Sequence, residues 1–371
     1  MILGIDTSTY LEQQRISHPV YKKDGKIIDP FTLFKQNGVT VLRTRIWNDP
    51  YGENKEPYLA GTCDVDNFIN LAKHVARYRF KHIIDFHYSD FWCDPSKQQL
   101  PKAWVGLTYE ELVLALYQFT KNSLNRIKQE GIDVAMVQVG NEITNGMVWP
   151  YGHLDDGEGR QASFDRFASF LKSGIKAVKE VYPNAKIILH LERSYDQDAY
   201  REIISNLLNR GVQIDIVGSS YYPFWHHGFD EYFANMDMVR REFNLPVMNM
   251  ELGFPFTLLD YKKDEVTGEH KHLVINADNI EDYLKLMPYY PDIEGQAKFV
   301  EEFIKLAKEH HLEGVCYWEP TWIPGEGICW ASKAAQKYMN DTAKDTRNEW
   351  ANQCLFDYEG NALKALDKYK I

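Results

Sequence analysis

The alternation of short β-branched runs with longer helical patterns constrains the fold of this chain more than any other feature. Strand-like runs recur eight times from end to end, at residues 2–5, 39–45, 82–86, 134–139, 186–190, 214–219, 247–250 and 314–317. Strands that alternate with helices in this way are typical of repeated βα units. Eight such units predict a (β/α)8 TIM barrel of the α/β class rather than an open doubly wound sheet.

The segments between these runs carry helix start and stop signals. Thr108 and Glu111 stand at the spacing of a capping box, which predicts a helix that runs to about Glu130. Residues 164–181 place apolar side chains at helical spacing, and Pro183 follows as a stop signal. The spacing of the apolar residues therefore supports helices between the predicted strands.

The chain shows no sign of a second domain. Barrels of this class commonly occupy such a length as one unit, so residues 1–371 are predicted to form a single domain. The turn after the first run, residues 4–9, lacks the Gly-x-Gly-x-x-Gly pattern, which disfavours a dinucleotide-binding fold. The long irregular stretch at residues 254–291 is expected to be an elaborated loop after the seventh strand.

Two glutamates follow predicted strands directly. Glu142, preceded by Asn141, comes after the run at 134–139, and Glu251 comes after the run at 247–250. The carboxyl ends of barrel strands meet at one rim, so these side chains are expected to converge there. Two carboxyl groups on one rim are what a retaining glycosidase requires, one as acid/base and one as nucleophile. A structural salt bridge is the alternative for either glutamate taken alone.

Tryptophans gather near the predicted strand ends. Six of them fall within a few residues of such an end, namely Trp47, Trp92, Trp149, Trp225, Trp318 and Trp322. Trp350, by contrast, is expected to lie away from the rim. Burial in an ordinary core explains any one of these side chains. Their repetition at strand ends favours flat apolar platforms for sugar rings, with a ring nitrogen left to donate a hydrogen bond.

Charge and cysteine content exclude several partners and sites. The net charge of −11 argues against nucleic acid and against an acidic polymer, which leaves a neutral ligand favoured. No stretch approaches the ~20 apolar residues that span a bilayer, so no membrane partner is expected. The five cysteines form no Cys-x-x-Cys pair, which disfavours zinc and redox sites. No signal peptide is visible, so a cytoplasmic location is expected, or secretion if the chain was trimmed.

Several blocks of the chain, in order, resemble those of glycoside hydrolase family 53, the endo-β-1,4-galactanases. The blocks are VLRTRIWNDPYG, IIDFHYSDFWCDPSKQQLPKAW, VQVGNEITNGMVWP, IVGSSYYPFW, ELGFPF, GVCYWEPTWIPG and NQCLFDYEGNAL. The resemblance covers nearly the whole chain. It departs from the family pattern in three places on the substrate side: residues 58–64, the loop Leu191-Glu192-Arg193-Ser194 after the fifth strand, and the stretch after Glu251.

The resemblance implies a role for each matching residue. Glu142 is implied as the general acid/base, Glu251 as the nucleophile and Asn141 as the amide that contacts the sugar 2-hydroxyl. To act, Glu142 must stay protonated near neutral pH, which low-dielectric surroundings or the charge of Glu251 would favour. Glu251 must stay ionised, and a cation such as Arg45 within ~4–6 Å would favour that.

The same resemblance implies the residues that surround the two glutamates. Arg45, His87 and a tyrosine after the sixth strand are implied as supports of the nucleophile, with Tyr221 preferred to Tyr222. Trp318 is implied as the platform beneath the scissile sugar. Trp47 and Trp92 complete the predicted substrate-binding set.

The function expected from this is hydrolysis, with retention, of β-1,4-galactosidic bonds in galactan, arabinogalactan or derived galacto-oligosaccharides. Two alternatives stay open: a retaining β-glycosidase of the same clan that acts on another glycan, and a sugar-binding barrel without catalysis. Asp85-x-His87 also suggests a metal-dependent hydrolase, but no His-x-His follows the first strand, so no metal ligand is assigned.

No cofactor is expected to be required. Structural calcium is considered for the loop after strand seven, because some bacterial members of the family bind calcium there. The acidic residues of that loop are Asp260, Asp264, Glu265, Asp278 and Asp282. Their spacing fits no EF-hand, and hydration of a polar loop explains them as well.

Overall fold

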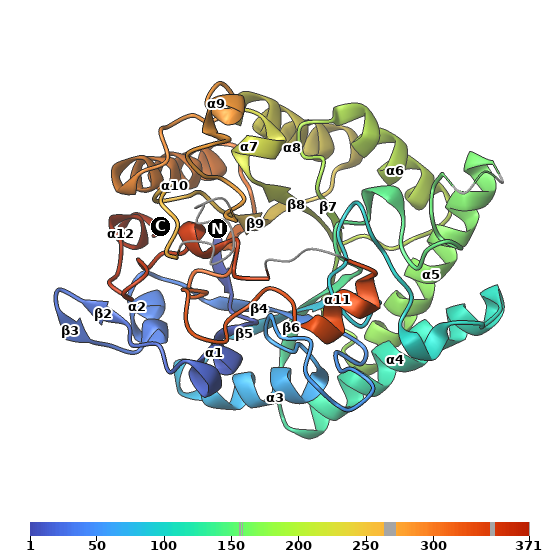
Figure 1. The fold of residues 1–371 in the computed structure, drawn as a ribbon. Coiled ribbons are helices and arrows are strands. Elements are labelled where there is room, and N and C mark those ends of the chain that lie inside the picture. Colours follow the sequence, from blue (N-terminus) through green and yellow to red (C-terminus); the bar gives the residue numbers. More distant parts are fainter. Residues whose placement is uncertain (156, 158, 263–271, 342–345, 371) are drawn as a thin grey trace.

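The computed structural model describes residues 1–155, 157, 159–262, 272–341 and 346–370. Its centre is a closed barrel of parallel strands in the order β1-β10-β9-β8-β7-β6-β5-β4, seen end-on in Figure 1. The strands are β1 (Ile2–Asp6), β4 (Val41–Ile46), β5 (Lys81–Phe86), β6 (Val134–Val139), β7 (Lys186–Leu191), β8 (Ile216–Tyr221), β9 (Val247–Leu252) and β10 (Gly314–Tyr317). The (β/α)8 prediction is confirmed, and the strand bounds differ from those predicted by at most two residues at either end.

Helices cover the outside of the barrel, as Figure 1 shows. Between and after the strands lie α1 (Tyr10–Ile16), α2 (Pro30–Gln36), α3 (Val65–His74), α4 (Tyr109–Gln129), α5 (Arg160–Val181), α6 (Gln197–Asn209), α8 (Phe229–Phe243), α10 (Ile293–Glu309) and α12 (Lys364–Lys368). The predicted capping box is present: Thr108 Oγ1 accepts from the Glu111 amide, and Glu111 Oε2 accepts from the Thr108 amide at 2.8 Å. Such a cap fixes where α4 begins.

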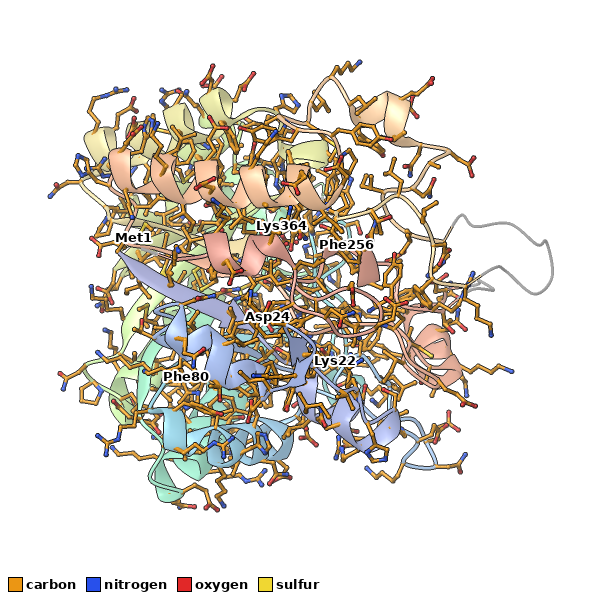
Figure 2. All side chains as sticks on the ribbon, turned by 90° about the vertical axis from the view of Figure 1, so that its left-hand side faces the viewer. Met1, Lys22, Asp24, Phe80, Phe256 and Lys364 are labelled. Atoms are coloured by element: carbon orange, nitrogen blue, oxygen red, sulfur yellow. The ribbon has the colours of Figure 1, made fainter. Side chains whose placement is uncertain are left out.

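Smaller elements decorate the barrel. They are the hairpin β2 (Lys22–Lys23) and β3 (Lys26–Ile27) and the short helices α7 (Pro223–His226), α9 (Ile280–Tyr283) and α11 (Lys333–Met339). The elaborated segment after β9 contains α9, and residues 263–271 lie outside the described part of the chain. In the side view of Figure 2, Met1, which precedes β1, and Phe256, which follows β9, lie at opposite ends of the barrel. None of the helices in the described part of the chain combines the length and the apolar composition of a membrane-spanning segment.

The interior of the barrel is divided along its axis. The part nearer the amino ends of the strands is a compact apolar cluster that consists of Val41, Ile83, Met136, Ile188, Ile216, Met248, Met250 and Cys316. Two residues further along the strands, buried polar groups replace them: Arg43 follows Val41, Asp85 follows Ile83 and Gln138 follows Met136. Since side chains alternate across a strand, residues two apart share a face. The apolar plug thus supports a polar layer at the carboxyl ends of the strands.

Candidate active site

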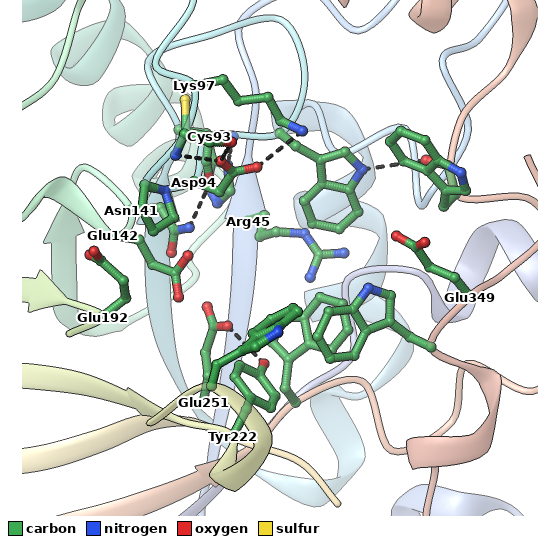
Figure 3. A pocket seen from close by; sticks show the side chains of 18 of the residues that line it. Arg45, Cys93, Asp94, Lys97, Asn141, Glu142, Glu192, Tyr222, Glu251 and Glu349 are labelled. Carbon is green, nitrogen blue, oxygen red and sulfur yellow. Dashed lines mark hydrogen bonds and ion pairs between the residues drawn. The ribbon is translucent and has the colours of Figure 1, made fainter. Parts of the chain in front are cut away.

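A cleft of about 390 Å³ opens above this polar layer, at the carboxyl ends of the strands. Figure 3 shows the side chains that line it. Of the predicted site residues, the structure brings together Arg45, His87, Trp92, Asn141, Glu142, Glu251 and Trp318 in its wall. Trp47 and Tyr221 do not line it. Its volume is in the range of small-ligand sites.

Glu142 enters the cleft through an unusual backbone turn. After β6 ends at Val139, Gly140 has φ +94° and Glu142 itself has φ +49° and ψ +53°, in the left-handed region. That region is costly for a side chain other than glycine, and such strain is concentrated at functional sites. The turn directs the carboxyl group toward Glu251, and an oxygen of each carboxyl lies within 4.8 Å of the other (Figure 3).

Glu251 is held by a cation and a phenol. Its Oε1 lies 2.9 Å from Arg43 Nη2, and its Oε2 accepts a hydrogen bond from Tyr222 Oη at 2.9 Å. Arg45 was expected as this cation, but the residue that contacts Glu251 is Arg43. Arg43 is fully buried and also contacts Asp6 at 2.9 Å and Asp85 at 2.8 Å.

The preference for Tyr221 over Tyr222 was wrong. Tyr221 is the last residue of β8, and its ring faces outward, stacked on Phe299 and Phe303 of α10. Its hydroxyl donates to the His227 carbonyl, away from the cleft. Tyr222 follows with the opposite orientation, because adjacent side chains of an extended chain face opposite sides.

Arg45 has a different part in the cleft. It lies two residues further along β4 than Arg43, on the same face of the strand. Its Nη2 lies 2.7 Å from Glu319 Oε1. Its guanidinium carbon lies 4.4 Å from the centre of the Trp92 ring and 5.5 Å from that of Trp318. Arg45 therefore contributes to the floor of the cleft and orders two of its aromatic walls through cation–π contacts.

Burial raises the pKa of both glutamates, but their neighbours separate them. For Glu142, burial and the charge of Glu251 both act upward, and its pKa lies well above the ordinary value. For Glu251, burial raises the pKa while the Arg43 guanidinium lowers it, so the net rise is smaller. Of the pair, Glu142 therefore keeps the proton and Glu251 gives it up first, the division of roles that acid catalysis and nucleophilic attack require.

A hydrogen-bonded chain orients Glu142 and Asn141. Ser220 Oγ donates to Glu142 Oε1 at 2.6 Å, and His190 Nε2 lies 3.0 Å from Ser220 Oγ. Asn141 Oδ1 accepts from Arg43 Nη2 at 3.0 Å, and its Nδ2 donates to the Cys93 carbonyl at 2.9 Å. These contacts fix which face of the Asn141 amide is turned to the cleft.

His87 supports the polar layer. Its Nε2 lies 3.0 Å from Asp85 Oδ2, and its Nδ1 accepts from the Cys93 amide at 3.0 Å. Burial raises the pKa of Asp85, but Arg43, His87 and His190 together outweigh burial and lower it to about 2. Asp85 and His87, the pair that suggested a metal, are thus engaged with Arg43 and with the backbone.

His190 is a further candidate ligand beside the two glutamates. A nitrogen of His190 does lie within 4.8 Å of an oxygen of Glu142 and of Glu251. Both of its ring nitrogens are hydrogen-bonded, Nδ1 with Gln138 and Nε2 with Ser220. A metal ion at this place would have to displace one of these contacts.

Tryptophans form the apolar wall of the cleft. The lining members are Trp92, Trp225, Trp318, Trp322, Trp330 and Trp350. Trp350, expected to lie away from the rim, packs on Trp318 with ring centres 5.0 Å apart, because the C-terminal segment folds back over the barrel. Trp225 is the most open large apolar side chain of the wall, 44% exposed. Trp47 is fully buried behind Trp92, at 5.1 Å between ring centres, and supports the wall without facing the cleft.

Removal of Arg43 is expected to have a large effect on stability. In the Arg43→Met variant, the buried charges of Asp6, Asp85 and Glu251 lose their common cation. Breaking a buried ion pair by removal of one partner costs about 3–5 kcal/mol. We expect the free energy of unfolding, measured in urea, to fall by that amount.

Arg77→Met is the matched control for this variant. Arg77 pairs with Asp29 at the surface and is 67% exposed. Exposed pairs contribute roughly 0–1 kcal/mol. Equal losses of stability in the two variants would contradict the central part assigned to Arg43.

The chain matches the model of a known protein family. The model of glycosyl hydrolase family 53 matches residues 2–369, almost the whole chain. The chain is also similar to a solved structure, the GH53 catalytic domain of Ignisphaera aggregans. The two share 34% identity with a TM-score of 0.85, over 99% of this chain and 95% of the other.

Curated relatives match over most of their length as well. The endo-β-1,4-galactanase of Bacillus subtilis (strain 168) is 32% identical over 100% of this chain and 85% of its own. The arabinogalactan endo-β-1,4-galactanase of Cellvibrio japonicus (strain Ueda107) is 29% identical over 86% of this chain and 80% of its own. Both similarities extend over the strands that supply Glu142 and Glu251.

Proposed function

Because this chain belongs to glycosyl hydrolase family 53, we propose that it hydrolyses β-1,4-galactosidic bonds in galactan by double displacement with retention. The observation that carries the proposal is the pair of glutamates with carboxyl oxygens within 4.8 Å of each other. Retaining enzymes hold their carboxyl groups ~5–5.5 Å apart, whereas inverting enzymes leave about 6.5–9.5 Å for a water molecule. Oxygens no more than 4.8 Å apart fit the shorter spacing of a retaining enzyme.

In the first step, Glu142 donates its proton to the glycosidic oxygen as the bond to the anomeric carbon breaks. Glu251 attacks that carbon from the opposite face and forms a covalent glycosyl ester. The leaving chain departs as a neutral alcohol. Tyr222 and Arg43, which contact the two oxygens of Glu251, hold its carboxylate in position for the attack.

In the second step, Glu142 is a carboxylate and acts as a base. It accepts a proton from water, which attacks the anomeric carbon and releases Glu251. With each displacement the anomeric configuration is inverted, so the product keeps the β configuration. Capture of the sugar by Glu251 removes one negative charge from beside Glu142, which makes proton release from Glu142 easier at this stage.

The nature of the cleft supports a neutral sugar chain as substrate. Its wall is mainly tryptophan, and five of its lining residues are acidic: Asp94, Glu142, Glu192, Glu251 and Glu349. Both cations that line the cleft are already paired, Arg45 with Glu319 and Lys97 with Asp94. An acidic polymer would meet net repulsion there. The relatives named as galactanases support galactan among neutral chains.

Product analysis on purified β-1,4-galactan tests the proposal. We expect short galacto-oligosaccharides from internal cleavage, with the β-anomer formed first when the reaction is followed by proton NMR. An initial α-anomer would contradict retention. Preferred release of reducing sugar from a glucan or mannan would point to a sister β-glycosidase, and binding without any hydrolysis would point to a sugar-binding barrel.

The proposed chemistry uses two carboxyl groups and water, so it calls on no cofactor. Calcium in the segment after β9 stays a prediction. Asp264 and Glu265 lie outside the described residues, and Asp260 is bonded to His272. A rise in melting temperature with added calcium, reversed by chelator, would support the site, and an unchanged melting temperature would rule it out.

A further inference from the structure

A third carboxyl group belongs to the cleft and has no part in the two steps above. Glu192 stands directly after β7, in the loop where the sequence departs from the family pattern, and it is 5% exposed. It lines the same cleft as Glu142 and Glu251. In Figure 3 it lies on the Glu142 side of the cleft, whereas Glu349 lies on the far side.

Glu192 is tied to the turn that carries Glu142. Its Oε2 accepts a hydrogen bond from Thr144 Oγ1, and its amide donates to the same hydroxyl at 3.3 Å. Thr144 belongs to the short helix Ile143–Asn145, which begins directly after Glu142. The Thr144 hydroxyl thus links the end of β7 to the end of β6 and fixes the Glu192 carboxyl relative to Glu142.

The other oxygen of Glu192 is poorly compensated. Within the described residues, Oε1 is buried and accepts no hydrogen bond. The nearest cation is Arg193, whose Nε lies 3.6 Å away. Arg193 is itself turned toward Asn145, to which its Nη2 donates a hydrogen bond. A buried carboxylate whose second oxygen has no hydrogen bond, and whose one nearby cation is a partly exposed arginine at 3.6 Å, keeps part of its field within the cleft.

We propose that Glu192 is a positioning residue that keeps the acid/base Glu142 protonated. This inference rests on the proposed function, because it assigns Glu192 a part in the same reaction. A second negative charge in a water-poor cleft disfavours ionisation of its neighbour. Glu192 therefore extends the pH range in which Glu142 can protonate the leaving sugar.

Other charged and titratable groups also face Glu142, and they set the background for this effect. They come from the loops after β5 and β8 and from the strands β7 and β9, and they are Asp94, Lys97, Tyr222, His226, His190 and Glu251. Glu251 is the strongest of them, and Glu192 is next, ahead of Asp94. Tyr200 faces Glu192 from α6 and stays neutral, because burial raises the pKa of its phenol well above the ordinary value.

Glu192 carries its charge in the pH range in which Glu142 would otherwise lose its proton. Burial raises the pKa of Glu192 to about 7, against which the Thr144 hydrogen bond acts. Glu192 is thus neutral in mildly acidic solution and charged above neutral pH, where Glu142 would otherwise begin to lose its proton. Without Glu192, Glu142 therefore ionises at lower pH, and the alkaline fall of kcat/KM moves to lower pH.

The direct test is a titration of Glu142 that needs no substrate. Protein labelled with ¹³C in the glutamate side-chain carboxyl is followed by NMR, with the Glu142 signal assigned by its loss in Glu142→Gln. In Glu192→Gln, we expect the midpoint of Glu142 to fall by about one pH unit, the effect of one unit charge at short range in a protein site. Glu192→Met, which also removes the charge but changes the shape, should give the same shift.

Glu349→Gln is the matched control, because it removes a carboxyl group that lines the same cleft on its far side. We expect the Glu142 midpoint to stay where it is in this variant. The same midpoint in Glu192→Gln as in the wild type would overturn the proposal. So would an equal shift in Glu349→Gln, because the effect would then belong to the cleft as a whole.

The pH dependence of kcat/KM on galactan completes the test. In Glu192→Gln we expect the alkaline limb to move to lower pH by the same amount as the NMR midpoint, and the acid limb to move less. A higher KM with unmoved limbs would make Glu192 a substrate contact and overturn the proposal. Wild-type protein without any action on galactan would contradict the proposed function, and the NMR titration would still decide the part of Glu192.

Discussion

Replacement of Glu251 by glutamine is expected to lower kcat/KM on β-1,4-galactan by roughly 10⁴–10⁶-fold, the scale of loss when a covalent catalyst is deprived of its nucleophile. The glutamine amide has nearly the shape of the carboxylate but cannot form the glycosyl ester. Initial rates of reducing-sugar release measure the loss. Galactan binding by Glu251→Gln, measured by calorimetry, should persist, because the tryptophan wall is unchanged.

The fold of this variant should survive. Arg43 keeps Asp6 and Asp85 as partners when the charge of Glu251 is gone, so the polar layer remains paired. Circular dichroism checks this. Glu349→Gln, in which another carboxyl group of the cleft is changed, should retain far more activity. Full turnover by a folded Glu251→Gln would end the assignment of the nucleophile.

Replacement of Glu142 by glutamine should give a loss that depends on the leaving group. On galactan we expect a loss of about 10²–10⁴-fold, the usual contribution of general acid–base catalysis. An aryl β-galactoside with an acidic phenol needs no protonation to leave, so its first step should stay fast. The glycosyl enzyme should then accumulate, because no base activates water, and a burst of phenol should precede slow turnover.

Azide distinguishes this role from a general loss of structure. A small anionic nucleophile needs no base, so added azide should restore turnover of the aryl galactoside by Glu142→Gln and yield the β-galactosyl azide. The wild-type protein and Glu251→Gln serve as controls. Azide should not increase the turnover of the aryl galactoside by either of them. An equal loss on galactan and on the aryl galactoside, without rescue, would show that Glu142 is not the acid/base.

The fold and the two glutamates could be predicted because their signals are local. The strands are short runs rich in β-branched residues that alternate with helical patterns, and Glu142 and Glu251 stand at the ends of two such runs. Parallel strands in a barrel bring such ends to the same rim whatever the details of packing. The convergence of the two carboxyl groups therefore followed from the order of elements alone.

The errors concern which of two similar residues contacts Glu251. Arg43 and Arg45 lie on the same face of β4, and only the height of each in the barrel decides which meets Glu251 and which meets Glu319. Tyr221 and Tyr222 are adjacent, and the register shift between β8 and β9 near Ser220 affects how the strand end is oriented. Residues of one type at neighbouring positions carry no local signal of height or orientation.

Other parts of the site come from segments far apart in the chain. Trp330 and Trp350 follow β10 by many residues and return over the cleft, and Glu192 is placed by its bond to Thr144. The sequence by itself determined the barrel, its polar rim and the pair of carboxyl groups, because strand periodicity and strand order are properties of the chain. Only the tertiary structure decided which cation, phenol and third carboxyl group surround that pair, because those contacts depend on the stagger of neighbouring strands and on loops that close over them.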